Sequence, residues 1–208
     1  MTGTADTARD DLAYLRGILD ERRPGLRMGG LLYAAAGLIY GGQVLVSAAA
    51  LSGFAGLGDG VHGPAAIVAN ALYAAVIAFA IWQNRGAPPM RGTATRTLSA
   101  AFAGVGIANG VAAIAFAIAG SQLPGWNPWL IFPITVCAFQ GAAWLILAAV
   151  TRRAWMACIA AGWFLTAPVL AALLGSLDLY LFALAAALLA FMALPGAVLF
   201  RAASHDRW

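Results

Sequence analysis

Residues 128–174 read PWLIFPITVCAFQGAAWLILAAVTRRAWMACIAAGWFLTAPVLAALL, and this stretch decides the fold. Two apolar runs, 128–150 and 154–174, stand on either side of the short joint TRRA at 151–154. Each run has close to the ~20 residues that an α-helix needs to cross a hydrocarbon core about 30 Å thick. Because so short a joint only permits a sharp reversal, the stretch predicts two antiparallel membrane-spanning helices.

Four more apolar runs of similar length lie outside this pair. We place six spans at about 28–52, 64–83, 98–119, 128–150, 154–174 and 178–200. The composition agrees, since 62% of the 208 residues are hydrophobic and 10% are charged, against about half and a quarter in soluble domains. We therefore expect an all-α integral membrane protein, a six-span transmembrane helix bundle. A weak repeat (YAAAG 33–37, FAGVG 102–106, CIAAG 158–162) leaves three tandem helix hairpins open as its organisation.

The charged residues predict the orientation of this bundle. With six spans, all twelve arginines fall on the side that holds both termini, and the chain has no lysine. That side carries twelve Arg and six acids, net +6, while the other side carries two acids, net −2, which together give the overall +4. By the positive-inside rule the arginine side is cytoplasmic. Arginine without lysine in an Ala- and Gly-rich chain fits a high-GC bacterium, so we expect a bacterial inner (cytoplasmic) membrane.

The two ends of the chain, 1–27 and 201–208, are predicted to be cytoplasmic. Within the first, residues 8–23 (ARDDLAYLRGILDERR) carry an apolar stripe among charges, formed by Leu12, Leu15, Ile18 and Leu19. This spacing predicts an amphipathic helix. The helix could rest on the bundle, lie on the membrane or dock a cytoplasmic protein partner. Its acids nearly cancel its arginines, which weakens any attraction to anionic lipid.

Charged residues and histidine are absent from the interior of the predicted spans, and Asp178 stands at the outer end of the last one. This disfavours acid–base catalysis and a proton-coupled transporter with a buried carboxylate. Cys137 and Cys158 lie in separate apolar runs, where they act as small apolar side chains. Asp59 and His62 would supply two metal ligands at most, so we expect no metal site. We accordingly expect a protein that is not an enzyme and uses no cofactor.

Uncharged polar residues remain within the spans, and each of the first five spans carries one at a similar depth. Counted from the predicted cytoplasmic end at 1.5 Å per residue, they lie roughly 15 to 22 Å deep, in one layer. They are Gln43, Asn70, Asn109, Gln140 and Thr166, flanked by Tyr40, Tyr73 and Trp163. Two interpretations compete. The layer is interhelical glue, or it lines a small polar cavity for a neutral or zwitterionic ligand.

Small residues predict where helices pack closely. Gly37 and Gly41 in the first span form a GxxxG pattern, as do Gly106 and Gly110 in the third. Such patterns let two helix backbones approach. We expect these glycines to pack within the chain, with the interface of a homo-oligomer as the alternative.

Two classes of function fit these features. The first is a non-catalytic membrane protein of regulatory, sensing or partner-binding type, in which the bundle anchors or senses and the cytoplasmic helix reports. The second is a facilitator or transporter of a small neutral or zwitterionic molecule, with the amide layer as its binding region. Its weakness is the absence of a charged group that could couple transport to an ion.

Overall fold

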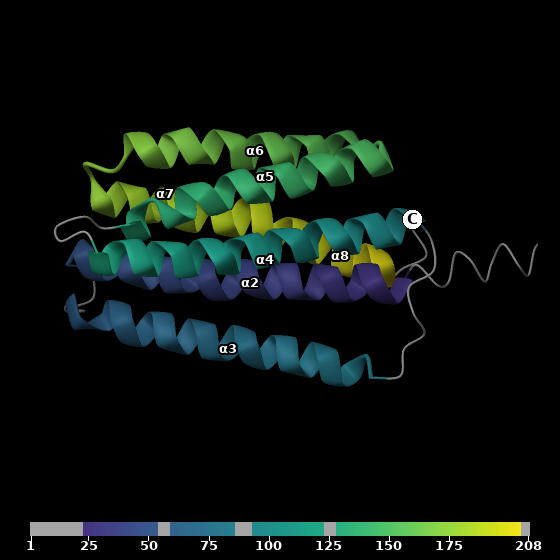
Figure 1. The fold of residues 1–208 in the computed structure, drawn as a ribbon, viewed down its shortest axis with the longest axis horizontal. Helices are drawn as coiled ribbons and strands as arrows, with labels where there is room; N and C mark the ends of the chain where they lie inside the picture. The colour runs from purple at the N-terminus through teal and green to yellow at the C-terminus, as the bar shows by residue number, and fades with distance from the viewer. Residues whose placement is uncertain (1–22, 54–58, 86–92, 123–127, 205–208) are drawn as a thin grey trace, which may run out of the picture.

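The structure is a computed structural model that describes residues 23–53, 59–85, 93–122 and 128–204. Within these ranges every regular element is a helix. In the described residues six helices are long and apolar enough to cross a membrane, which confirms the all-helical fold and the number of candidate spans. Figure 1 shows them as an elongated bundle in which all helices run along one common axis.

The bounds of the helices follow the apolar runs and extend past several of them. The helices at the predicted spans, called spans below, are α2 (Arg23–Leu51), α3 (His62–Gln83), α4 (Thr93–Gln122), α5 (Phe132–Thr151), α6 (Ala154–Ala172) and a last span of three segments, α7 (Leu177–Leu188), the π-helical η4 (Leu189–Ala193) and α8 (Leu194–Ser204). Short 3-10 turns, η2 (Asp59–Val61) and η3 (Pro128–Leu130), precede α3 and α5. Pro24 and Pro133 sit in the first turns of α2 and α5, where the missing N–H of proline costs no helical hydrogen bond.

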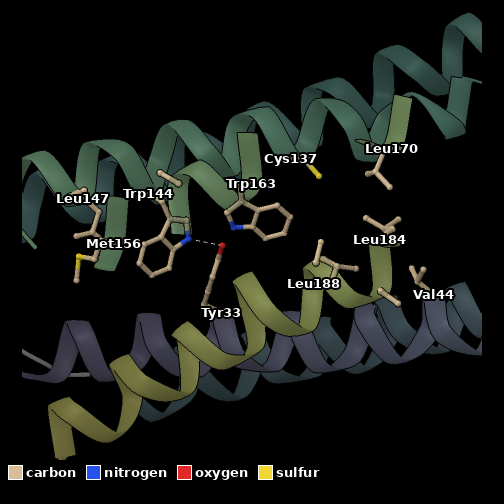
Figure 2. Packing of buried hydrophobic residues seen from close by; sticks show 14 of the residues in the cluster. Tyr33, Val44, Cys137, Trp144, Leu147, Met156, Trp163, Leu170, Leu184 and Leu188 are labelled. Carbon is tan, nitrogen blue, oxygen red and sulfur yellow. Dashed lines mark hydrogen bonds between the residues drawn. The ribbon is translucent and has the colours of Figure 1, made fainter. Parts of the chain in front are cut away.

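Two helix pairs form the core of the bundle. The first and last spans lie side by side, with α2 in contact with α7, η4 and α8 along its length. The second pair is the α5–α6 hairpin, closed by Arg152, whose left-handed backbone (φ 55°, ψ 33°) ends α5. Trp144, Trp163 and Tyr180 are almost fully buried between the pairs. Figure 2 shows this core from close by.

Backbone contact holds the first and last spans together. A Cβ added at Gly37 would lie 2.3 Å from the backbone N of Ala193, and one at Gly196 would lie 2.3 Å from the N of Ala34. Neither position has room for any side chain. Nearer the start of α2, a Cβ at Gly30 would lie 2.6 Å from the N of Phe200. The two helices are therefore in close contact from the middle of the bundle to one of its ends.

The remaining spans, α3 and α4, are peripheral. α3 packs mainly on α2, and α4 packs mainly on α5. None of the side chains described in α4 is buried, and α3 buries only Ala69 and Ala80, whereas α2 and the last span bury a much larger share of their residues. Figure 1 shows α3 along one edge of the bundle, with the α5–α6 pair at the opposite edge.

Charge is divided between the two ends of the bundle. Because consecutive spans alternate in direction, the arginines of the described ranges all lie at the end where α2 begins: Arg23, Arg27, Arg85, Arg96, Arg152, Arg153 and Arg201. The acidic residues of the same ranges, Asp59 and Asp178, precede α3 and begin α7 at the other end.

Candidate functional site

A hydrogen-bonded trio joins the first span to the fourth inside the core. The indole N–H of Trp144 donates to Tyr33 Oη over 2.7 Å, and that hydroxyl donates to Gln140 Oε1 over 3.1 Å. All three side chains are buried. In Figure 2 the Tyr33 side chain points from α2 toward Trp144 and Trp163 on the opposite helix pair. The trio satisfies polar atoms that would otherwise be costly to bury at this depth.

Trp163 supplies a hydrogen-bond donor to a backbone carbonyl of the last span that lacks its usual helical partner. Pro195 has no N–H with which to reach the carbonyl four residues earlier, that of Phe191. The indole N–H of Trp163 donates to this Phe191 oxygen over 3.2 Å. The Phe191 ring in turn fills the space above Gly162, where a Cβ would lie 2.6 Å from ring carbons. The π-helical turn η4, the proline and the tryptophan thus form one structural unit that ties α6 to the last span.

A second polar group lies between α2 and α3. Tyr40 Oη donates to Asn70 Oδ1 over 3.1 Å, and Asn70 Nδ2 donates to the carbonyl of Ala66 over 2.8 Å. The Tyr40 and Tyr73 rings meet edge to face, with centroids 5.4 Å apart. Asn70 is exposed at the surface of the bundle, whereas Tyr40 and Tyr73 are half-buried. This group holds the peripheral helix α3 onto the core.

Two other residues of the predicted layer bond within their own helix. Thr166 Oγ1 donates to the carbonyl of Gly162 over 2.7 Å, and Gln43 Nε2 lies 3.4 Å from Ser47 Oγ. Both bonds span one helical turn. The hydrogen bonds described for Thr166 and Gln43 therefore do not join one helix to another.

Asn109 is different from the rest of the layer. Its Oδ1 is shielded from solvent and has no hydrogen-bond partner among the described residues. Asn109 shares a face of α4 with Phe102 and Phe116, whose rings contact Trp144 and Phe132 of α5. The amide oxygen therefore points toward the bundle and stays unpaired there, which costs free energy in an apolar setting.

The two glycine patterns have opposite surroundings. Gly37 lies against the backbone of Ala193, and a Cβ at Gly41 would lie 3.1 Å from the Leu189 side chain. A Cβ at Gly106 or Gly110 would meet nothing within 4 Å. The first pattern thus packs within the chain. The second has no such contact with the described residues, because α4 turns these glycines away from α5.

Several residues of the core are not singled out by the sequence. Tyr33 and Trp144 lie in apolar runs. Tyr180, in the first turn of α7, is buried and donates to the carbonyl of Leu130 over 2.6 Å. The hydrogen-bonding groups of their side chains are the feature of the sequence that could have identified them. A phenol or an indole inside a span needs a hydrogen-bond partner, and the same argument singles out Trp163 and Tyr40.

The predicted layer therefore divides into separate groups and does not converge on one point. The side chains described there can form hydrogen bonds and carry no charge. The described residues hold no group of three or more His, Cys, Asp or Glu side chains that could bind a metal ion. The predicted docking stripe, Leu12, Leu15, Ile18 and Leu19, lies outside the described residues. No family model, curated protein or solved structure matches this chain.

Proposed function

We propose that this is a non-catalytic, multi-pass protein of a bacterial inner membrane that binds a transmembrane helix of a partner, with a regulatory or sensing role that follows from this binding. Its four-span core would act as a rigid scaffold, and its peripheral spans would be the binding part. The arginine-bearing end and both termini would face the cytoplasm under the positive-inside rule.

The observation that carries this proposal is the surroundings of α4. A Cβ added at Gly106 or Gly110 would have no atom of the described residues within 4 Å, although α4 is apolar enough to cross the membrane. Small residues continue the glycine pattern along the helix at alternating spacings of three and four: Ala103, Gly106, Gly110, Ala113 and Ala117. Such spacing forms a straight row of small residues along one side of a helix, of the kind that packs against a second helix.

Contact with lipid alone does not explain why α4 carries glycines in this row. Glycine is about 1 kcal/mol less favourable than alanine inside a helix, and lipid tails gain nothing from its small size. The neighbouring side of α4 carries the large residues expected against lipid, with Ile107, Val111 and Ile114 each more than 60% exposed. The helix therefore has one side suited to lipid and one suited to another helix backbone.

The mass of the native particle tests this proposal. We would extract the protein from its own membrane with a lipid-retaining polymer and measure the mass. We expect more than one 21.4 kDa chain, either a second copy or another protein. Gly106→Leu with Gly110→Leu should release the partner, whereas Val111→Leu with Ile114→Leu, on the lipid side, should retain it. A wild-type particle with one chain, or an assembly indifferent to the glycine variant, would contradict the proposal.

The alternative, facilitated passage of a small neutral or zwitterionic molecule, has one observation in its favour. Asn109 Oδ1 is a buried hydrogen-bond acceptor with no partner among the described residues, and a solute with a donor group would satisfy it. The other polar residues of the layer favour the structural role, because each already has a hydrogen-bond partner within the chain.

A further inference from the structure

The seam between the first and last spans ends in a pair of arginines. Arg27 lies on α2 and Arg201 on α8, and both side chains are exposed. The guanidinium carbon of Arg27 is 5.3 Å from the ring centroid of Phe200, the residue that precedes Arg201. Close contact of the two backbones at Gly30 and Phe200 keeps the helices from separating at this level. The two arginines thus lie at the same end of two tightly packed helices, with Arg201 next in sequence to the ring that the Arg27 guanidinium contacts.

These two charges have no counterion in the described part of the chain. Its acidic residues, Asp59 and Asp178, lie at the opposite end of the spans. From Asp178 to Arg201 the last span rises roughly 35 Å at 1.5 Å per residue, more than three Debye lengths of about 10 Å. Nearby cations repel each other, and no residue in the described part of the chain supplies an anion that offsets this repulsion, so an external anion would stabilise this end of the seam.

We propose that Arg27 and Arg201 bind the phosphate of an anionic phospholipid at the end of the α2–α8 seam. The pair lies at the end of two membrane-spanning helices, at the depth of lipid headgroups. Arginine offers planar pairs of N–H donors that match two phosphate oxygens, which makes it the preferred residue for such contacts. The Phe200 ring restrains the Arg27 guanidinium and so lowers the entropy lost when the lipid binds.

Thermal unfolding in defined bilayers tests this site with the full chain. We would compare phosphatidylcholine bilayers with bilayers of phosphatidylcholine and phosphatidylglycerol in equal parts. A ligand that binds the folded state raises the melting temperature, so phosphatidylglycerol should raise it by several degrees. Inorganic phosphate added to phosphatidylcholine bilayers should give a much smaller shift. If it gives the full shift, the site binds free phosphate and the lipid assignment is wrong.

Variants with matched charge separate this site from general attraction to anionic lipid. Arg27→Gln with Arg201→Gln lowers the net charge from +4 to +2, and so does the control pair Arg85→Gln with Arg152→Gln at the same end of the bundle. The first pair should lose the shift caused by phosphatidylglycerol, and the control should keep it. Equal loss in both pairs, or no shift in the wild type, would overturn the proposal.

Two further variants keep the test decisive. Arg27→Lys with Arg201→Lys preserves the charge that guides membrane insertion, so it answers the question even if the Gln pair does not fold. We expect a reduced shift, because lysine cannot form the paired contact, and a full shift would overturn the paired contact. Asp20→Asn, Glu21→Gln and Asp206→Asn together remove the acids nearest to the two arginines in the sequence. If those acids are the counterions, this variant melts earlier in both bilayers and the wild type does not respond to phosphatidylglycerol.

Discussion

Trp144 donates its indole N–H to the hydroxyl of Tyr33 over 2.7 Å, across 111 positions of sequence. This bond crosses the core from the α5–α6 pair to the pair formed by the first and last spans. The tyrosine hydroxyl donates its own hydrogen to Gln140, so one oxygen links two helices through two bonds. In a bundle whose helices are uniformly apolar, such bonds fix which faces meet, because hydrophobic burial cannot distinguish one apolar face from another.

Removal of this hydroxyl should destabilise the protein. Tyr33→Phe leaves the Trp144 N–H and Gln140 Oε1 without a partner in the core, and we expect the free energy of unfolding to fall by about 1 to 3 kcal/mol. Tyr73→Phe is the control, since the described contact of Tyr73 is a ring contact that phenylalanine keeps. Unfolding in mixed detergent micelles measures both. Equal stability of the two variants would show that the trio contributes nothing.

The tryptophan and the proline of the last span should be energetically coupled. Trp163→Phe removes the donor to the Phe191 carbonyl, and we expect a loss of about 1 kcal/mol. Pro195→Ala supplies a backbone N–H for the same carbonyl, so Trp163→Phe should cost less in that background. A double-mutant cycle on unfolding free energies measures the coupling. Additive effects would mean that Trp163 does not compensate for the proline.

The two glycine patterns should respond differently to one added methyl group. Gly37→Ala places a Cβ 2.3 Å from the backbone of Ala193, and we expect the resulting separation of helices to cost about 1 to 3 kcal/mol. Gly106→Ala meets open space and should leave the detergent-purified single chain as stable as the wild type or slightly more stable. Both are measured by thermal unfolding. The reverse order would place the close helix contact on α4.

Asn109 and Gln140 should differ although both are amides in the same layer. Gln140→Leu breaks the bond from Tyr33 and should lower the free energy of unfolding by about 1 kcal/mol or more. Asn109→Leu removes an oxygen that no described residue hydrogen-bonds, so stability should be unchanged or higher. A marked loss in Asn109→Leu would show that a water molecule or another group satisfies this oxygen.

The sequence contains enough information for the number of spans and for the segregation of arginine to one end. Both depend on run length and charge, which local composition determines. The GxxxG pattern also indicates that Gly37 lies in a close helix contact. The indole N–H of Trp163, inside an apolar run, indicates that this side chain needs a hydrogen-bond partner. The identity of that partner is hidden, because nothing local shows that the carbonyl freed by Pro195 faces α6.

The pairing of helices could not be predicted from periodicity. In spans with apolar residues on every side, the sequence does not show which face of the helix packs against a neighbour. The contact of the first span with the last is therefore not visible in the sequence. The need of the polar layer for hydrogen-bond partners is predictable. Its division into the Tyr33 trio, the Tyr40–Asn70 pair and the unpaired Asn109 depends on helix rotation, which is set by packing in three dimensions.

The most direct test of this account is whether the polar layer binds a ligand. We would screen the purified protein by thermal shift against small neutral and zwitterionic solutes, with Asn109→Leu and Gln140→Leu in parallel. A structural layer predicts that no solute raises the melting temperature and that Gln140→Leu alone melts earlier. A solute that stabilises the wild type, and loses this effect in the folded Asn109→Leu variant, would contradict the account and establish a solute-binding site.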